Sequence, residues 1–431
     1  MLRIKRLIFQ FIYKLAVLIK PIIARFLTPD IRQRGKRLLL KKAYPIEKKQ
    51  HETLNNEFKK GVNLVGYARA EMGIGESCRI AANNMNAVGI PFGIMNFKGT
   101  NSARMSDLTW IDKEMDAPLY SVNVFHINAE QMMEVYAEYG NLLFQNRYNI
   151  GFWHWELPDF PDEWLEACEL VDEIWAPSTF VVDSIAMKSP VPVVKIPHSI
   201  EVRIEEPRDR TYFGLPEDAF LFLSMYDIKS YQERKNPNAS IKAFKGAFGP
   251  MDESVGLVIK VNSYNSSLDE LSNLYNLIGD YTNIYIIKET LSRNDTNALL
   301  AVIDSYVSLH RSEGFGLGLA EAMYLGKPVI GTNWSSNIDF MNSVNSCLVR
   351  YRLINVGKDQ GPYKAYQYWA DPDIDHASDY MKRLVTDSDY YSSVASKGEA
   401  FIKEYYSPHA IGRLIQKRLE YINLWKFGGA K

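Results

Sequence analysis

Short apolar runs alternate with amphipathic segments along most of the chain, starting at residue 61. Residues 61–66 are typical of a buried strand, and a glycine-containing turn separates them from a helical pattern at 77–87. The apolar run at 89–95 is the next strand, so the three segments form a β-α-β unit. Further strands are predicted at 122–127, 148–153, 173–176 and 193–196, with helices at 162–170 and 179–187. This alternation predicts a mostly parallel sheet covered by helices.

A second series of the same kind begins near residue 219. Its predicted strands are 220–225, 256–260, 283–287, 305–309 and 328–331, and its predicted helices are 238–248, 268–278, 296–302 and 317–324. Between the two series, 201–216 is rich in charge and proline, which is typical of a linker. The predicted fold class is α/β, with Rossmann-like, doubly wound domains at 61–205 and 217–405 facing each other across a cleft. Residues 406–431 are expected to form a helix that crosses back to the first domain.

The first 45 residues have the pattern of an amphipathic helix. At about 100° per residue, one side is apolar and the opposite side carries Arg3, Arg6, Gln10, Lys14 and Arg25. The apolar side consists of Ile8, Ile12, Leu15, Ile19, Ile22 and Phe26. Charges near the middle argue against a membrane span, because each costs about 2.5–3.5 kcal/mol there. Lys14 also interrupts the apolar stretch that a signal peptide would need.

Charge is distributed unevenly between this arm and the rest of the chain. The whole sequence of 431 residues has a formal net charge of −1. Residues 1–42 carry twelve Lys and Arg against one acid, Asp30, so they stand at +11 and the remainder at −12. A cationic amphipathic arm favours an anionic membrane surface over nucleic acid as its partner. The alternative is a helix that packs on the body of the protein.

Composition excludes several other classes of protein. Hydrophobic residues make up 46% and charged residues 23% of the chain, as in globular proteins, and the length suits two domains. Cys78, Cys168 and Cys347 are far apart and form no CxxC pair, which argues against a disulfide framework and a cysteine-based zinc site. The seven histidines form no HxxxH or HxH pair. We therefore expect a reducing compartment and no metal site.

The most informative segment is 308–331, in which a strand is followed by the loop Glu-Gly-Phe-Gly and then by a helix. The N–H groups and the positive dipole end of such a helix suit a phosphate. Glycines in the loop let a ligand approach the backbone closely. Glu313 lies in the loop and Glu321 inside the helix, so the two carboxylates can contact different parts of one elongated ligand.

This segment, with Glu313 and Glu321 eight positions apart and Gly-Lys-Pro-Val-Ile after them, resembles the retaining glycosyltransferases of family 4, which have the GT-B fold. The resemblance covers most of 61–425. It implies that Glu313 contacts hydroxyls of the donor sugar and that Glu321 holds the ribose of the nucleotide. The donor site then also includes Gly314, Phe315, Gly316 and Leu317.

A cationic segment upstream, 224–237, resembles the part of the family that neutralises the leaving diphosphate. Lys235 is the closest match to the family lysine, and the resemblance assigns it a catalytic role. The arginine that the family carries a few residues earlier has no clear counterpart. Arg234 is the candidate substitute, although adjacent residues usually point in different directions. Lys260 ends its predicted strand and is a further donor-binding cation at that edge of the sheet.

Gly73 and Gly75 lie in the turn between the first predicted strand and helix. The family has a glycine loop here that faces the donor diphosphate across the cleft, so the resemblance assigns both glycines to donor binding. A tight turn without a ligand is the alternative.

Residues at the ends of two further strands complete the predicted site. The family has a histidine that meets the donor sugar, a catalytic role that the resemblance assigns to His126, although Asn128 can occupy the expected place. His154 and Glu156 follow the next strand and, with Asn128, are assigned to the acceptor pocket. The tryptophans on either side of His154 either stack on a sugar ring or belong to an ordinary buried strand.

The sequence thus predicts a retaining glycosyltransferase that moves a sugar from a nucleotide-sugar donor to a saccharide or lipid-linked saccharide in the synthesis of a bacterial surface polysaccharide such as lipopolysaccharide. We expect no cofactor and no metal, and a peripheral location on the cytoplasmic face of the membrane. One alternative is a glycoside hydrolase that uses Glu313 and Glu321 as acid and base. The other is a catalytically silent GT-B scaffold in a polysaccharide assembly complex.

Overall fold

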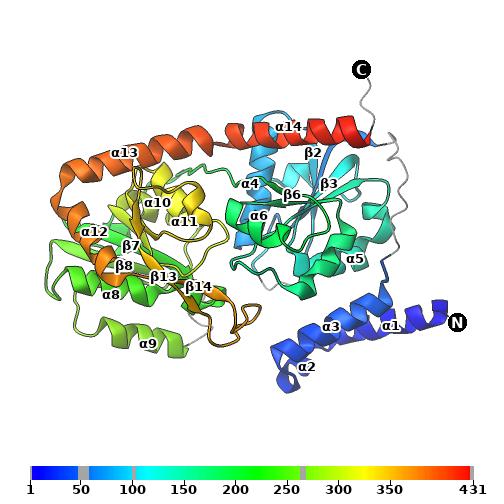
Figure 1. The fold of residues 1–431 in the computed structure, drawn as a ribbon, viewed down its shortest axis with the longest axis horizontal. Coiled ribbons are helices and arrows are strands. Elements are labelled where there is room, and N and C mark those ends of the chain that lie inside the picture. Colours follow the sequence, from blue (N-terminus) through cyan, green and yellow to red (C-terminus); the bar gives the residue numbers. More distant parts are fainter. Residues whose placement is uncertain (1, 47–57, 100–102, 263–267, 428–431) are drawn as a thin grey trace.

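Two α/β domains lie side by side, and a helical arm lies next to the first of them (Figure 1). The computed structural model describes residues 2–46, 58–99, 103–262 and 268–427. Each domain contains one six-stranded sheet with helices packed on its faces. The expected architecture of two doubly wound, Rossmann-like domains is confirmed.

The first domain has a parallel sheet of order β2-β1-β3-β4-β5-β6. Apolar residues sit in register at its centre, where Val62 lies between Phe92 and Val122. The strands are β1 (Lys59–Gly66), β2 (Phe92–Asn96), β3 (Tyr120–His126), β4 (Tyr148–Phe152), β5 (Glu173–Ala176) and β6 (Val193–Lys195). The helices are α4 (Gly73–Ala87), α5 (Met132–Phe144) and α6 (Thr179–Ala186), with 3₁₀ helices η1 (Ile111–Lys113), η2 (Ala129–Gln131) and η3 (Asp162–Leu170).

The second domain repeats this plan with the order β12-β11-β10-β7-β8-β9. Its strands are β7 (Phe220–Asp227), β8 (Val255–Asn262), β9 (Ile284–Ile287), β10 (Ser305–Ser308), β11 (Val329–Thr332) and β12 (Cys347–Val349). Its helices are α7 (Gln232–Lys235), α8 (Pro237–Ala247), α9 (Leu268–Ile278), α10 (Arg293–Val302), α11 (Leu317–Tyr324), α12 (Ile374–Thr386) and α13 (Ser388–Tyr405), with 3₁₀ helices η4 (Thr211–Phe213) in the segment before it, η5 (Ile228–Ser230) and η7 (Ser336–Asp339).

The sequence prediction missed several parts of this domain, which include β12, α12, α13 and one pair of strands. An antiparallel pair, β13 (Tyr351–Asn355) and β14 (Tyr368–Pro372), follows the last strand of the sheet. Most of β13 is exposed, so it lacks the apolar alternation by which a half-buried strand is recognised. The loop that joins these two strands reaches the first domain, as described below.

The chain returns to the first domain through α14 (Pro408–Lys426), which runs along the top of the view in Figure 1. Its buried face joins the same apolar cluster as β1 and α4. Arg418 also pairs with the fully buried Glu173 of β5, with Nε 2.9 Å from Oε1. The last helix therefore packs on the first domain.

The arm consists of three helices, α1 (Leu2–Leu18), α2 (Lys20–Phe26) and α3 (Pro29–Ala43), where the sequence predicted one. Pro21, near the start of α2, has no N–H for a bond to the preceding turn, and the helix breaks at Ile19. α1 and α3 lie side by side (Figure 1). Lys36 of α3 pairs with Glu134 of α5 at 2.6 Å, so this part of the arm is packed on the body of the protein.

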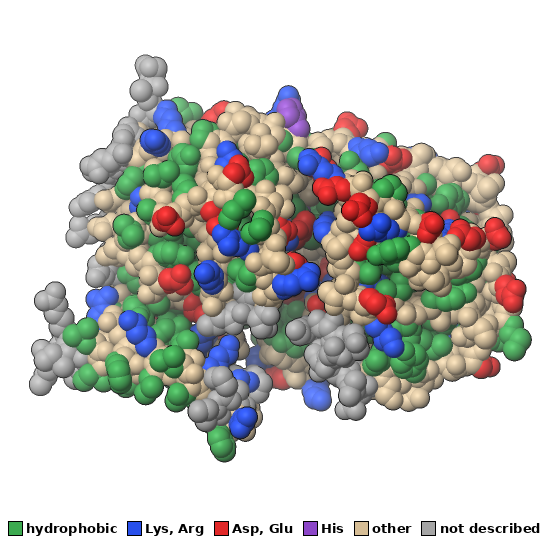
Figure 2. Space-filling view, turned by 180° about the vertical axis from the view of Figure 1, so that it is seen from behind, with side chains coloured by type: hydrophobic (Ala, Val, Ile, Leu, Met, Phe, Trp, Pro, Cys, Tyr) green, Lys and Arg blue, Asp and Glu red, His purple; other side chains and the backbone are tan. Residues whose placement is uncertain are grey.

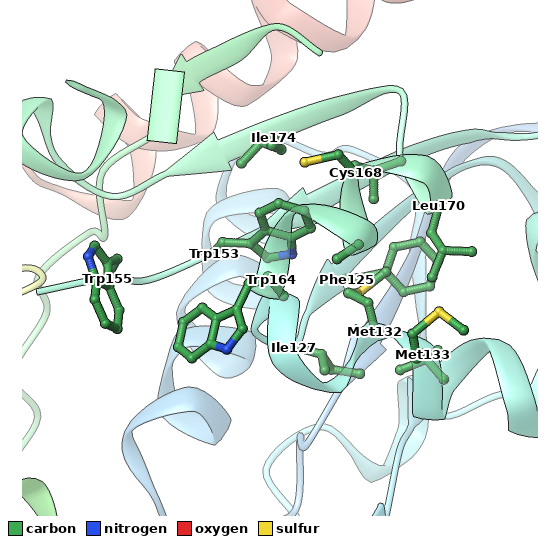
Figure 3. Packing of buried hydrophobic residues seen from close by; sticks show 14 of the residues in the cluster. Phe125, Ile127, Met132, Met133, Trp153, Trp155, Trp164, Cys168, Leu170 and Ile174 are labelled. Atoms are coloured by element: carbon green, nitrogen blue, oxygen red, sulfur yellow. The ribbon is translucent and has the colours of Figure 1, made fainter. Parts of the chain in front are cut away.

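The tryptophans beside His154 belong to the core of the first domain (Figure 3). Trp153 and Trp155 are 0% and 1% exposed, and the rings of Trp155 and Trp164 lie 5.0 Å apart. Neither indole is available to a sugar, so both are core residues, although they lie in the segment just after β4 and not in the strand itself. The polar residues between and after them, His154 and Glu156, face the other domain instead.

Candidate active site

A cavity of about 410 Å³ lies between the two domains, at the carboxyl ends of both sheets. The strand order reverses between β1 and β3 and between β7 and β10, which is where open α/β sheets bind ligands. Most of the residues predicted from the sequence line it: Gly73, Asn128, His154, Glu156, Arg234, Lys235, Lys260, Glu313, Gly314, Phe315, Gly316, Leu317 and Glu321. His126 and Gly75 do not line it.

Glu313 is the electrostatic centre of the cavity. Its Oε1 lies 2.5 Å from Nζ of Lys235, and its Oε2 lies 3.4 Å from Nη1 of Arg234. The backbone N–H of Glu313 donates to Oγ of Ser335 at 2.9 Å, which fixes the loop between β10 and α11. Burial alone would raise the pKa of Glu313, but the two cations outweigh it and lower the pKa to about 2. The carboxylate is therefore ionised at any physiological pH.

The shape of α7 brings two adjacent cations to one carboxylate. Tyr231 before this helix and Asn236 after it both have positive φ, 62° and 51°, so the chain turns sharply on either side of four helical residues. Arg234 also donates from Nη1 to the carbonyl of Ser312 at 2.9 Å. Adjacent residues were expected to diverge, but the two oxygens of Glu313 accept one cation each. Arg234 thus places a second positive charge beside Glu313, and its role as a substitute for the family arginine stays a prediction.

Lys260 adds a third cation to the same cavity, from the end of β8. It is only 2% exposed, and its Nζ donates to Oδ1 of Asn262 at 2.5 Å. Burial lowers the pKa of Lys260 to about 8, since Glu289 and Asp227 compensate only in part. An anion bound in the cavity would stabilise the charged form of Lys260 and so raise its pKa.

Glu321 lies on α11, further along the cavity, and is also paired. Its Oε1 lies 2.5 Å from Nη2 of Arg293, the first residue of α10. The same Nη2 lies 3.6 Å from Oε1 of Glu76 on α4, in the other domain. Arg293 therefore contacts a carboxylate from each side of the cavity.

The glycines of the site differ in what they do. Gly316 has φ 96° and starts α11 in the left-handed region, which favours glycine. A Cβ on Gly314 would lie 3.3 Å from the carbonyl of Trp155, so this loop passes close to the first domain. Gly73 begins α4 and has open space around the position of a Cβ. A Cβ on Gly75 would lie 2.2 Å from the carbonyl of Ala70, so packing of the turn requires glycine there.

The two predicted histidines, His126 and His154, form a neutral cluster with His198 around Phe152. Nε2 of His154 lies 2.9 Å from Nε2 of His198, and both rings line the cavity. His126 lies behind them, stacked on Phe152 with ring centroids 4.4 Å apart and with Nδ1 2.8 Å from Oγ of Ser77. Burial lowers the pKa of His154 to about 4 and that of His126 to about 3, and it places the pKa of His198 well below its usual value.

The residues predicted for the acceptor side join the two domains. Asn128 accepts the backbone N–H of His154 through Oδ1 at 3.0 Å and so fixes the turn after β4. Oε2 of Glu156 accepts from the hydroxyl of Tyr363, at 3.1 Å, in the loop between β13 and β14. The carbonyl of Glu156 accepts from the hydroxyl of Ser312, one residue before Glu313. Glu156 therefore links the first domain to the loop that carries Glu313.

This arrangement favours stabilisation of an anion over acid catalysis. A glycoside hydrolase needs one carboxyl group with a raised pKa. Glu313 has the opposite shift, and Glu321 is paired with an arginine. Four cationic side chains, those of Arg234, Lys235, Lys260 and Arg293, line the cavity together with residues at the N-termini of α4 and α11. Within the described residues, no three His, Cys, Asp or Glu side chains gather as a metal site.

The sequence did not single out Arg293 or His198. Arg293 follows β9 of the second sheet, and His198 follows β6 of the first sheet. A search for polar residues after every strand would therefore have included both. Neither belongs to a recognisable motif, because their partners come from other elements. Glu76 and Glu321 are distant from Arg293 in sequence, and only the fold brings them together.

One family model matches part of the chain. Residues 206–344 match the family Glycosyl transferases group 1. This range contains Arg234, Lys235, Lys260, Arg293, Glu313 and Glu321, which are the charged residues of the cavity that come from the second domain. No curated protein sequence matches the chain.

Several solved structures share the fold. The structure of Anabaena HepE in complex with UDP and glucose is 14% identical, with a TM-score of 0.59, and the match covers 84% of this chain and 100% of that one. Sucrose-phosphate synthase from Thermosynechococcus elongatus is 13% identical, with a TM-score of 0.61 and coverage of 84% and 99%. A glycosyltransferase from Rickettsia africae is 13% identical, with a TM-score of 0.60 and coverage of 84% and 98%. The architecture is the GT-B fold.

Proposed function

We propose that this chain, a glycosyltransferase of GT-B fold with a glycosyl transferases group 1 domain at 206–344, is a retaining enzyme. It moves a sugar from a nucleotide-sugar donor to a saccharide or lipid-linked saccharide acceptor. The biological role that we propose is synthesis of a bacterial surface polysaccharide at the cytoplasmic face of the membrane. The observation that carries the proposal is the pairing of Glu313 with Lys235 and Arg234 in the cavity between the domains.

The leaving group is a nucleoside diphosphate, and its developing charge must be stabilised. Lys235, Arg234 and Lys260 surround the place where this charge forms, together with the N-terminus of α11. Preorganised charges of this kind lower the barrier because they do not have to reorient during the reaction. Glu313 keeps the two cations of α7 in place and accepts hydrogen bonds from hydroxyls of the donor sugar.

We propose that the transfer retains the configuration of the anomeric carbon, as the family that the sequence resembles does. The bond between the anomeric carbon and the diphosphate oxygen breaks, and the acceptor oxygen bonds to the same face of the sugar. The departing phosphate oxygen takes the proton of the acceptor hydroxyl. Glu313, ionised and paired with two cations, is an orienting group in this scheme rather than a base. No resident metal is required, because lysine, arginine and backbone N–H groups serve the diphosphate.

Association with the membrane is proposed from the arm. α1 turns Gln10 toward α3, where its Nε2 donates to the carbonyl of Ala43, and leaves apolar side chains outward. Leu7, Phe11, Leu18 and Phe26 are 61%, 68%, 77% and 81% exposed. Figure 2 shows hydrophobic side chains together with Lys and Arg on the surface of the arm. This combination suits the interface of an anionic bilayer. None of the described helices is long and apolar enough to cross one.

The proposed function is tested by donor binding and turnover. Thermal unfolding is measured with UDP, GDP, ADP and dTDP and with their sugars, since a ligand at 100 times its dissociation constant adds about 2.7 kcal/mol of stability. The nucleotide-sugar that stabilises the chain is then incubated with saccharide acceptors, and the anomeric configuration of the product is read by NMR. Retention supports the proposal. Inversion, or no stabilisation by any nucleotide, contradicts it.

A further inference from the structure

Arg293 connects the carboxylate proposed for the ribose with the opposite domain. Its Nη2 lies 2.5 Å from Oε1 of Glu321 and 3.6 Å from Oε1 of Glu76. The side chain of Glu321 is 6% exposed, whereas that of Arg293 is 46% exposed. We call these three residues the Arg293 bridge. The arginine thus reaches from the solvent-accessible part of the cavity to a buried acid.

We propose that Arg293 competes with the nucleotide for Glu321, and that a bound ribose displaces its guanidinium from Glu321 toward Glu76. The inference rests on the proposed function, in which Glu321 holds the ribose. It adds a residue that determines how tightly the donor binds.

The competition follows from the limited access to a buried carboxylate. The side chain of Glu321 is only 6% exposed, and the half-exposed Arg293 reaches it from the open part of the cavity. A carboxylate oxygen can accept two hydrogen bonds, but the two neighbouring hydroxyls of a ribose have to reach Glu321 through the opening that the guanidinium occupies. One oxygen of Glu321 already accepts from Arg293. The charged guanidinium makes a stronger hydrogen bond to a carboxylate than a neutral hydroxyl does. The ribose therefore has to replace a favourable contact. Donor affinity is therefore lower than the ribose contacts alone would provide.

Glu76 makes the exchange possible at a moderate cost. A charge separated from its partner in a buried site is strongly destabilising. The guanidinium of Arg293 is half-exposed and already close to Glu76, so it stays paired after it leaves Glu321. Burial would raise the pKa of Glu76, but Arg293 and Arg79 outweigh it and lower that pKa, which keeps the second acid ionised.

The first test compares a nucleotide with a probe that has no ribose. Calorimetry measures the binding of inorganic pyrophosphate and of the nucleoside diphosphate that stabilises the wild type in the thermal screen. Arg293→Gln should bind the nucleoside diphosphate about fivefold more tightly, which is ~1 kcal/mol at 1.4 kcal/mol per factor of ten. It should not bind pyrophosphate more tightly. Simple loss of a positive charge would weaken the binding of both.

Arg208→Gln is the matched control. Arg208 pairs with Asp295, two residues further along α10 than Arg293, with Nε 3.2 Å from Oδ1, but it does not line the cavity. This variant disturbs the same helix start without touching the Arg293 bridge. Its affinity for the nucleoside diphosphate should equal that of the wild type.

The second test is a double-mutant cycle on the bridge. Glu76→Gln removes the acid to which Arg293 moves, so this variant should bind the nucleotide about threefold more weakly. Removal of a negative charge near a diphosphate would by itself have the opposite effect and strengthen nucleotide binding. In the Arg293→Gln background the same change should not weaken binding, because no guanidinium has to move.

Glu321→Gln separates the inference from the function on which it rests. If Glu321→Gln weakens nucleotide binding but Arg293→Gln leaves it unchanged or weaker, the inference is wrong and the ribose site stands. If Glu321→Gln leaves nucleotide binding unchanged, the ribose assignment is wrong, and the inference falls with it.

Discussion

Nζ of Lys235 lies 2.5 Å from Oε1 of Glu313, although the two residues are 78 positions apart in the sequence. One comes from the short helix after β7 and the other from the loop after β10, two neighbouring strands of the second sheet. The contact places a cation and a carboxylate at the point where the strand order reverses. Both can therefore act on the same atoms of a bound donor.

Replacement of Glu313 by Gln should affect turnover far more than binding. Glutamine keeps the size of the side chain but not its charge, so the two cations of α7 lose their common partner and the sugar its orienting acceptor. We expect kcat to fall about a hundredfold or more, with the affinity for the nucleoside diphosphate close to that of the wild type. Steady-state kinetics and calorimetry check this. Glu399→Gln, at an exposed pair on α13, is the control.

Lys235 and Arg234 should differ in their effect on stability. Lys235→Ala removes a charge beside the leaving group and should raise the barrier by about 3–4 kcal/mol while the protein stays folded. Arg234 is 5% exposed and also holds the carbonyl of Ser312, so Arg234→Ala should lower the unfolding temperature as well as kcat. Turnover and thermal unfolding of both variants separate the two roles. Equal kcat in Lys235→Ala and wild type would contradict the mechanism.

The stability contributed by Glu313 should depend on pH in one direction. Its pKa in the folded protein is about 2, below the usual 4.5, because Lys235 and Arg234 outweigh the effect of burial. The ionised carboxylate therefore stabilises the fold fully above about pH 4.5, and this contribution is lost as the pH falls toward 2. The difference in unfolding free energy between wild type and Glu313→Gln should be constant from pH 7 to 4.5 and shrink below. Urea unfolding at several pH values measures it. A difference that grows on acidification would be inconsistent with this pairing.

The outward face of α1 should be needed for binding to anionic vesicles. Leu7, Phe11 and Leu18 are exposed on this helix, so replacing all three with Ser should abolish sedimentation with such vesicles without lowering the unfolding temperature. Leu142 and Met187 are exposed on the body of the first domain, and their replacement with Ser is the control. Complete removal of the arm would be a poorer experiment, because Leu40 of α3 is buried against that domain. Unchanged sedimentation of the triple variant would mean that another surface binds the lipid.

Transfer should continue in the presence of EDTA. The cavity offers Arg234, Lys235 and Lys260 to a diphosphate, which removes the need for a divalent cation as counter-ion. Activity assays with EDTA, and with added magnesium or manganese, check this. If EDTA abolishes turnover and magnesium or manganese restores it, the lysines and arginines of the cavity are not sufficient to stabilise the diphosphate.

The amino-acid sequence by itself determined the two β-α series and the local shape of the loop between β10 and α11. Strand and helix patterns are local, since they depend on which faces of a segment are apolar, and this holds for β10, α11 and the glycine at 316. The motif around Glu313 and Glu321 is local as well, because one loop and one helix carry it. The break between α1 and α2 could also have been anticipated from Pro21.

Only the tertiary structure decided which charges meet. Arg234 reaches Glu313 because α7 lies between two residues with positive φ. Asparagine adopts this conformation readily, as at Asn236, but tyrosine rarely does, so nothing in the sequence predicts it at Tyr231. Arg293 joins Glu321 and Glu76 across the two domains. The fold also placed His126 behind Phe152 and His154 on the cavity. Ion pairs between distant residues depend on the packing of whole domains, and a side-chain pattern that repeats every two or 3.6 residues contains no information about them.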